Sequence, residues 1–494
     1  MGHAYSSIIA DFFARFKRID GYKVHFLTGT DEHGLKIQRA AEEKKIEPLK
    51  FCDEISKTFK DLSKILNLSN TDFIRTTEER HKKSVQYLWN ELEKNNDIYL
   101  SKYSGWYSVS DEAYYNDDEI TNNNDIKIAT LSGSPVEWIE EESYFFKLSK
   151  WQDKLLEYYD KNPEFISPKS KKNEVINFVK NGLKDLSISR KTFTWGIKVP
   201  NNTDHVIYVW LDALTNYISA LDYPNTNSKL YKDFWPASIH LIGKDILRFH
   251  AIYWPAFLMA AKIQLPTKVY GHGWILSGDE KMSKSKGNIL DPLVIIKNYG
   301  IDQLRYYLIK EVSFGNDGNI SLNKLENCIN SDLANNYGNL CQRVVSFAEK
   351  NCSLKIPNNI KFNNDDLKIL NNFTNNLENL RSEIDKQNIN YYIDFIVNSL
   401  FDANKYFNDQ EPWKKKDDNE RLNTIVFTAL EIIRKITFLL YPIIPESSIK
   451  VLNIFNLKEN DLNISSIGIH DYLKGGNPLN KIEILFKKIE KIND

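Results

Sequence analysis

Cysteine is scarce in this chain and is never found at metal-binding spacing. The 494 residues include four cysteines, and no two of them are separated by just two residues. This distribution argues against a disulfide framework and against a cysteine-rich zinc site. Reduced thiols in a cytoplasmic protein are therefore the expectation. The four are Cys52, Cys328, Cys341 and Cys352.

Long apolar runs and an excess of charge are also absent. The most apolar run, residues 251–261, is short and contains Pro255, so we expect neither a membrane span nor a signal peptide. The formal net charge is −1, which argues only against a histone-like binder, because an enzyme can concentrate basic residues on one face. The length allows roughly two to four domains.

A glycine- and lysine-rich stretch runs from Gly271 to Asn288, with four glycines and three serines. Such a composition gains little from burial, so it predicts a mobile loop. Lys281 and Lys284 are close enough to direct two ammonium groups at one polyphosphate, where they would neutralise charge during phosphoryl or nucleotidyl transfer. The alternative is an ordinary solvated basic loop.

The first residues predict a helix followed by a strand. Apolar residues recur at helical spacing from Tyr5 to Ile19, and the run Val24 to Leu27 suits a buried parallel strand. Asp31 and Glu32 follow in a small-residue loop, and loops after parallel strands are where α/β sheets bind ligands. The alternative is that one of these two acids caps a helix over 35–45.

Gly2 and His3 stand at the start of the first predicted helix. Free backbone N–H groups at a helix start bind phosphate, and glycine permits close approach. An imidazole can also donate a hydrogen bond to a phosphate oxygen. Alone, this pair of residues is a weak indication of a phosphate site.

The remaining chain divides into three segments with different sequence patterns. Residues 96–202 are aromatic, acidic and irregular, which is typical of an inserted domain. Strands are then expected at 206–210, 239–242 and 268–270, with a helix over 246–260, in a doubly wound α/β pattern. Beyond Pro292 the pattern is almost wholly helical and predicts an all-α carboxyl-terminal domain.

The string from Lys281 to Ser285, KMSKS, resembles the lysine loop of class I aminoacyl-tRNA synthetases. The chain is similar to the methionyl-tRNA synthetase family, because it carries that family's motifs in the same order. They are GTDEHG at 29–34, preceded by Thr28, YVWLDA at 208–213, GKDI at 243–246 and the lysine loop. Gly2-His3 resembles the second half of that class's His-x-Gly-His signature. Its first histidine, and the first strand of the fold, would then lie before Met1.

This resemblance implies a domain order. A Rossmann-like catalytic domain is interrupted by a connective insert, and an α-helical anticodon-binding domain follows. The insert of many relatives holds zinc on cysteine pairs, whereas residues 103–119 contain no cysteine, so we expect a metal-free knuckle held by its Tyr and Trp side chains. The implied boundaries are 1–95 and 203–275 for the two catalytic halves, 96–202 for the insert, 276–328 for the lysine loop and stem-contact region, and 329–494 for the helical domain.

The resemblance also implies a reaction and its residues. Methionine and ATP would give methionyl-adenylate and pyrophosphate, with Mg²⁺ on the phosphates and no zinc, and methionine would pass to tRNA(Met). His3, Lys281 and Lys284 would be catalytic. The implied sites are Gly2, His3, Gly243, Asp245, Lys281 and Lys284 for ATP; Asp31, Trp210, Tyr217, His250 and Trp254 for methionine; and Asn339, Arg343 and Trp413 for the anticodon. A cytoplasmic monomer is implied.

Three alternatives stay open at this point. A leucine-, isoleucine- or valine-type synthetase would use the same chemistry, although 96–202 is short for an editing domain. A truncated and catalytically impaired tRNA-binding protein would keep the same motifs. A nucleotidyltransferase of this fold that ignores tRNA would leave the helical domain unexplained.

Overall fold

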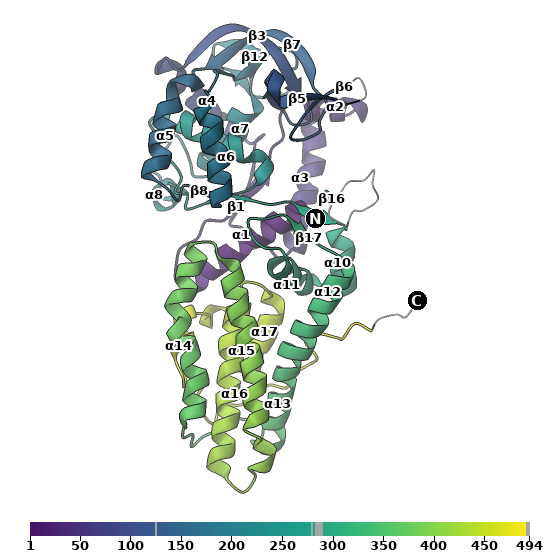
Figure 1. Cartoon of the computed structure of the whole chain (residues 1–494), viewed down its shortest axis with the longest axis vertical. Coiled ribbons are helices and arrows are strands. Elements are labelled where there is room, and N and C mark those ends of the chain that lie inside the picture. The colour runs from purple at the N-terminus through teal and green to yellow at the C-terminus, as the bar shows by residue number, and fades with distance from the viewer. Residues whose placement is uncertain (124–125, 278–279, 282–289, 491–494) are drawn as a thin grey trace. The chain divides into compact units, whose positions relative to one another are not determined.

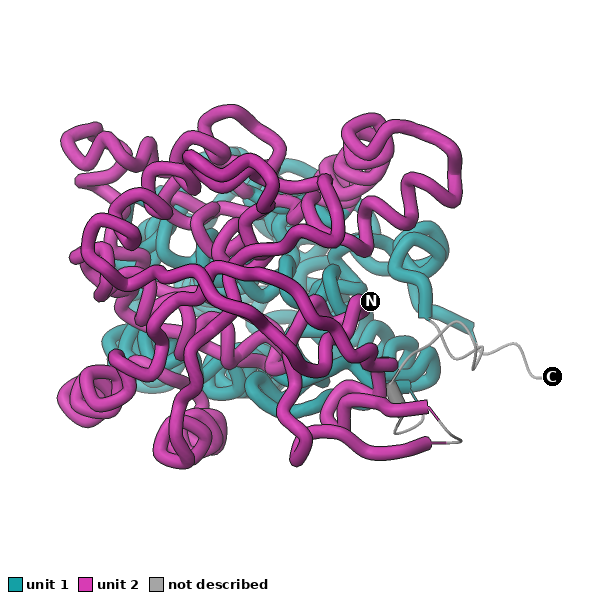
Figure 2. The backbone as a smooth tube through the Cα atoms, turned by 90° about the horizontal axis from the view of Figure 1, so that it is seen from above, with its two compact units in different colours: residues 1–24, 66–69, 273–494 teal, residues 25–65, 70–272 magenta. Residues whose placement is uncertain are grey.

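The computed structural model describes the chain except for residues 124–125, 278–279, 282–289 and 491–494, and the side chains of 280 and 281. The chain forms two compact units, coloured separately in Figure 2. The first unit combines 1–24, 66–69 and 273–494, and the second combines 25–65 and 70–272. Lys284 lies outside the described residues.

Two of the sheets of the second unit are built of parallel strands (Figure 1). β1 (Leu27–Thr30) pairs in parallel with β2 (Asp72–Arg75), and β13 (His240–Gly243) pairs in parallel with β14 (Val269–His272). The expected strands near 239–242 and 268–270 are confirmed. The strand expected at 24–27 instead begins at Leu27 and ends in the loop that carries Asp31.

Two details of this sheet architecture differ from the sequence analysis. The parallel strand expected at 206–210 is wrong in position and partners: β12 spans Asn202–Ile207, and α7 already begins at Val209. β12 pairs in antiparallel fashion with β10 (Ser189–Arg190) and β11 (Lys198–Val199). β8 (Ile166–Ser167) lies within the expected insert but pairs in parallel with β14. Strand partners are chosen by tertiary packing, which the local pattern of these short segments does not report.

A long pair of antiparallel strands dominates the inserted region. β3 (Ile98–Ser108) pairs with β7 (Glu137–Phe146) over almost their full length. Aromatic rings pack along it, as expected: the ring centroids of Tyr103 and Tyr114 are 4.5 Å apart, and the Arg190 guanidinium lies 4.3 Å from the Tyr114 ring. The smaller strands are β4 (Ala113–Tyr115), β5 (Ile120–Asn123), β6 (Ile126–Ala129) and β9 (Leu186–Ser187).

Helices flank the strands of this unit, and one of them is irregular. The helix expected over 246–260 is a π-helix at Phe249–Tyr253 that continues into α9 (Trp254–Ala260). The others are α2 (Leu35–Glu43), α3 (Pro48–Ile65), α4 (Glu79–Lys94), α5 (Gln152–Lys161), α6 (Lys169–Lys180), α7 (Val209–Ser219) and α8 (Lys229–Phe234).

The first unit is mostly helical. α1 (Gly2–Ile19) buries the apolar face that predicted it, and the expected all-α carboxyl-terminal domain is confirmed. No helix among the described residues is long and apolar enough to cross a membrane. The elements after the lysine loop are α10 (Pro292–Tyr299), α11 (Ile301–Glu311), α12 (Leu322–Cys328), a π-helix (Ile329–Gly338), α13 (Asn339–Asn351), α14 (Asn364–Asp385), α15 (Ile389–Asp409), α16 (Asn419–Leu440) and α17 (Pro445–Ile454). The short strands of this unit are β15 (Ile275–Ser277), β16 (Glu280–Lys281) and β17 (Gly318–Asn319).

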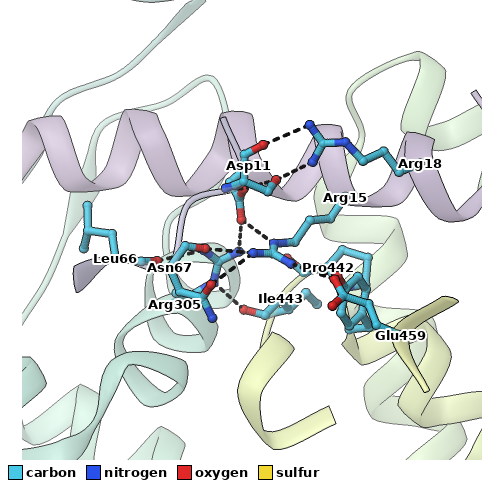
Figure 3. A network of polar contacts seen from close by, with 11 residues as sticks. Asp11, Arg15, Arg18, Leu66, Asn67, Arg305, Pro442, Ile443 and Glu459 are labelled. Carbon is cyan, nitrogen blue, oxygen red and sulfur yellow. Dashed lines mark hydrogen bonds and ion pairs between the residues drawn. The ribbon is translucent and has the colours of Figure 1, made fainter. Parts of the chain in front are cut away.

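A buried ion network joins α1 to the helical domain within this unit (Figure 3). Asp11, which is fully buried, accepts from Arg305 of α11 at 2.7 Å and from Arg15 at 2.7 Å. Arg15 also donates to the Tyr441 hydroxyl at 2.8 Å, and Arg305 donates to the Ile443 carbonyl at 2.8 Å. Because buried charges are costly unless they are paired, these contacts fix α1 against α11 and the end of α16.

Candidate functional site

Aromatic and imidazole side chains gather in the second unit around Tyr217 of α7. The Tyr217 hydroxyl lies 2.7 Å from His250 Nε2, and the opposite nitrogen, Nδ1, lies 3.0 Å from the Ile246 carbonyl. Since that carbonyl can only accept, Nδ1 carries the proton and Nε2 accepts from the tyrosine. The Tyr217 ring also stacks on His240, with centroids 3.9 Å apart. The Tyr217 hydroxyl and both ring nitrogens of His250 are therefore hydrogen-bonded within the protein.

Trp254 and His240 form the second hydrogen-bonded pair of this cluster. The Trp254 indole N–H donates to His240 Nε2 at 3.2 Å, so His240 is also neutral. Burial lowers the pKa of His250 to about 4, and burial together with the charge of His250 lowers that of His240 well below its ordinary value. The cluster is therefore uncharged at neutral pH and presents mainly ring surface.

Trp210 and Phe249 add a flat wall to the cluster. Their rings stack with centroids 3.8 Å apart and planes within 10°. The Trp210 indole nitrogen is buried and has no hydrogen-bond partner in the described part of the chain. In the π-helix at 249–253 the backbone N–H of Trp254 donates to the Phe249 carbonyl, five residues earlier. The structure thus brings together Trp210, Tyr217, His250 and Trp254, the four predicted pocket residues.

Asp31 lies in the loop after β1. Loss of solvation and the negative charges of Asp212 and Glu112 raise its pKa well above the ordinary value. Asp31 itself lies at the surface, so a cation can reach it from solvent. A carboxylate in such a position is stabilised by an incoming cation.

The neighbouring acid, Glu32, has a structural role. Its buried carboxylate accepts from Arg75 at 2.8 and 3.0 Å and from the Thr30 hydroxyl at 2.6 Å. α2 begins after Gly34 with no capping hydrogen bond from a side chain of its N-cap residue. The alternative in which Asp31 or Glu32 caps this helix is therefore not supported.

Asp212 organises the same region from α7. This fully buried carboxylate lies 2.7 Å from His33 Nδ1 and 2.7 Å from His81 Nε2, and His81 Nδ1 lies 2.8 Å from the Ser219 hydroxyl. Burial opposes ionisation, but the charge and hydrogen bond of His33, with those of His81, lower the pKa of Asp212. Sequence reasoning gave Asp212 no role, although an acid inside an apolar helix was the available signal.

The residues predicted for ATP lie at element ends. Gly2 is the first residue of α1 and His3 the second, so both lie in the first turn of this helix. Gly243 ends β13, and a Cβ there would lie 2.6 Å from the Asp245 carboxylate. Lys281 pairs with Leu276 in the β15–β16 hairpin. Gly2, His3 and Lys281 belong to the first unit, and Gly243 and Asp245 belong to the second.

The residues predicted for the anticodon share one surface of the first unit. Arg343 of α13 donates to the Asn408 side-chain oxygen at 2.6 Å and lies 5.6 Å from the Phe407 ring. Trp413 is 41% exposed and packs edge-on against the same Phe407 ring, at 6.3 Å. Asn339 is exposed one helical turn before Arg343. Sequence reasoning missed Phe407 and Asn408, which adjoin the predicted motif.

An ion pair supports this surface at the junction of α14, α15 and α16. Arg421 binds the buried Asp366 carboxylate with both terminal nitrogens, at 2.6 and 3.0 Å, and also donates to Gln410 at 2.5 Å. The Tyr406 hydroxyl donates to the same carboxylate at 2.5 Å. Gln410 lies three residues before Trp413, and Glu411 between them has φ of 43°. These contacts hold the turn that presents the indole.

Comparison with known proteins places these features in one family. Residues 1–345 match the family described as tRNA synthetases class I (M), and residues 356–494 match the anticodon binding domain of methionyl tRNA ligase. The chain belongs to the methionyl-tRNA synthetase family. Similarity at this extent covers both units, so the family assignment holds for the whole chain.

Relatives and solved structures of this family align over nearly the full chain. Methionine--tRNA ligase of Rickettsia felis is 48% identical over 99% of this chain and 96% of its own, and that of Brucella melitensis is 49% identical over 92% and 88%. Mycobacterium tuberculosis methionyl-tRNA synthetase bound by methionyl-adenylate has a TM-score of 0.95 and 43% identity over 98% of this chain and 96% of its own. The fold of the family is thus present in this chain.

Proposed function

We propose that this chain is a methionine–tRNA ligase that activates methionine with ATP and transfers it to tRNA(Met). The observation that carries this proposal is the neutral aromatic cluster of Tyr217, His250, His240 and Trp254. A thioether is apolar and polarisable, and each sulfur–ring contact contributes about 0.3–1.5 kcal/mol. The named activity of the relatives favours methionine over leucine, isoleucine or valine.

The proposed roles in activation follow from the chemistry of each group. Asp31 binds the methionine ammonium group, while Trp210, Tyr217, His250 and Trp254 enclose the side chain. Gly2, His3, Gly243, Asp245, Lys281 and Lys284 bind ATP, and Mg²⁺ would be held by its phosphates and supply charge neutralisation there. The methionine carboxylate attacks the α-phosphate and pyrophosphate leaves, so positioning and charge stabilisation suffice and no protein base is needed.

The transfer step is proposed to depend on the helical domain. Unpaired anticodon bases stack on indoles and hydrogen-bond to amides and guanidinium groups, which Trp413, Asn339 and Arg343 supply. We further propose the boundaries 1–95, 96–202, 203–275, 276–328 and 329–494, a metal-free insert, a monomer and a cytoplasmic location. Within the residues that the structure describes, no group of three or more His, Cys, Asp or Glu side chains is arranged to hold a metal.

The direct test is ATP–pyrophosphate exchange with methionine, leucine, isoleucine and valine on the purified chain, followed by charging of tRNA(Met). We expect exchange with methionine alone and charging of tRNA(Met). Exchange with leucine or valine in preference to methionine would show that the chain is specific for another amino acid. Binding of tRNA without any exchange would leave the tRNA-binding protein as the better description.

A further inference from the structure

Glu112 lies in the turn between β3 and β4 of the inserted region. Its φ is 49°, in the left-handed region that few residues other than glycine adopt. The Tyr208 hydroxyl donates to the Glu112 carbonyl at 2.9 Å, and Tyr208 itself is buried. The turn is therefore held in a conformation that aims the Glu112 side chain inward.

The Glu112 carboxylate meets the loop that carries Asp31. A Cβ on Gly34 would lie 2.1 Å from Glu112 Oε1, so a larger residue at 34 would have to displace the carboxylate. Gly34 also has φ of 110°, which disfavours any side chain there. Glu112 Oε1 is buried and has no hydrogen-bond partner among the described residues.

The same carboxylate stands at the N-terminus of α2. This helix has no side-chain cap from its own N-cap residue, Gly34, against which the Glu112 carboxylate lies. Burial raises the pKa of Glu112 to about 7, and the charge and backbone N–H of Lys36 oppose that rise. A carboxylate there satisfies a helix-end donor and interacts favourably with the helix dipole. The carboxylate beside the start of α2 thus comes from the turn between β3 and β4, far from the helix in sequence.

A second contact from beyond the hairpin holds the same loop. The Trp195 indole N–H donates to the Glu32 carbonyl at 2.7 Å, and the Gly34 N–H donates to the Trp195 carbonyl at 3.2 Å. Glu112 and Trp195 therefore contact the loop from Asp31 to Gly34 from two different segments of the chain. Of these two residues, Glu112 is the one whose negative charge also raises the pKa of Asp31.

We propose that Glu112 is a positioning residue for amino-acid activation, because its carboxylate fixes the start of α2 and with it the loop that presents Asp31. The proposal rests on the proposed role of Asp31 in binding the methionine ammonium group. Glu112 acts through the loop and does not itself touch the substrate.

The test compares Glu112→Ala, Glu112→Gln and the exposed control Asp118→Asn in methionine-dependent ATP–pyrophosphate exchange on the full chain. Loss of the cap should raise the methionine KM of Glu112→Ala about five- to tenfold, with little change in kcat or in the KM for ATP. The amide oxygen of Glu112→Gln can still accept from Lys36, so this variant should stay within about threefold of the wild type. Asp118→Asn should be unchanged.

The result that overturns the proposal is a methionine KM for Glu112→Ala equal to that of the wild type, or an equal loss in kcat and in both KM values. The second result would indicate general destabilisation, which a thermal melt and tRNA binding would detect independently. If the wild-type chain itself shows no exchange with methionine, the proposed function fails instead, so the two failures are distinguishable.

A double-mutant cycle with Gly34→Ala gives a second readout. Gly34→Ala alone should raise the methionine KM because its methyl group displaces the Glu112 carboxylate. The double variant should be no worse than Gly34→Ala, since both changes break one contact. Additive losses would contradict the proposed contact.

Discussion

The aromatic cluster around Tyr217 and the surface around Trp413 use similar side chains in opposite ways. In the cluster, Trp254 is fully buried and its N–H is occupied by His240, whereas Trp413 is 41% exposed. The cluster turns its hydrogen-bonding atoms toward each other and leaves ring faces for a side chain of matching shape. The helical surface leaves Asn339 and the indole open. Burial and internal pairing suit a small apolar group, and exposed polar groups suit nucleic-acid bases.

The largest expected effect concerns the buried charge of Asp212. Asp212→Asn removes the carboxylate that both His33 and His81 face, and breaking a buried ionic pair should cost about 4 kcal/mol of unfolding free energy. Urea unfolding measures this loss, with the exposed Asp222→Asn as the matched control. A loss equal to that of the control would show that the cluster does not depend on this charge.

The next largest effect is a pH dependence of stability that originates in His250 of the aromatic cluster. The pKa of His250 is lowered to about 4 by burial. The unfolded chain therefore takes up a proton below about pH 6.5 that the folded chain does not, so stability falls as pH drops. Between about pH 7.5 and about pH 5, His250 should account for a loss of about 2 kcal/mol.

The measurement for this prediction is urea unfolding of the wild type and of His250→Gln at both pH values. The variant lacks the titrating group and should lose about 2 kcal/mol less than the wild type over this interval. Equal losses for both proteins would mean that His250 is protonated in the folded state.

The internal pairing of the cluster predicts a smaller change in methionine affinity. Tyr217→Phe leaves His250 Nε2 buried without a donor, which costs 1–3 kcal/mol and should raise the methionine KM in exchange by about tenfold. The KM for tRNA should not change. Tyr87→Phe, at a residue that is 44% exposed, is the control. A change in the KM for tRNA of similar size would remove the distinction between the two regions.

We expect the smallest effect from weakening the Arg421–Asp366 ion pair, which holds the turn that carries Trp413. Arg421→Lys keeps the charge but loses the two-pronged contact with Asp366 and the bond to Gln410. Lysine does not replace arginine at such a site, and we expect about a threefold rise in the KM for tRNA with normal exchange. Exchange and charging kinetics on the same preparation test this, and an unchanged KM for tRNA would show that the turn is rigid without this ion pair.

Sequence reasoning identified the aromatic and imidazole side chains of the cluster, but not the long-range contacts that position the segments carrying them. Tyr217, His250 and Trp254 come from the resemblance of short motifs, and their helices follow from local periodicity. The pairing of β8 with β14, and the antiparallel partners of β12, depend on contacts between distant segments. The same holds for Asp212 with His81, where 131 residues separate the two partners.

The cap of α2 shows the same limit in one position. A local interpretation sought the cap in Asp31 or Glu32, the acids just before the helix. Glu32 instead binds Arg75, and the carboxylate at the helix start is Glu112. Capping preferences are local, and a partner supplied by an inserted hairpin leaves no local signal.

The most direct test of the division of roles between the two regions is Trp413→Ala, measured in exchange and in charging of tRNA(Met). Stacking on an exposed indole contributes about 1–3 kcal/mol per base, so the KM for tRNA should rise at least about tenfold. Methionine-dependent exchange should stay within about twofold of the wild type, because the cluster around Tyr217 lies in the other unit. A parallel fall in exchange, or unchanged charging, would contradict this account.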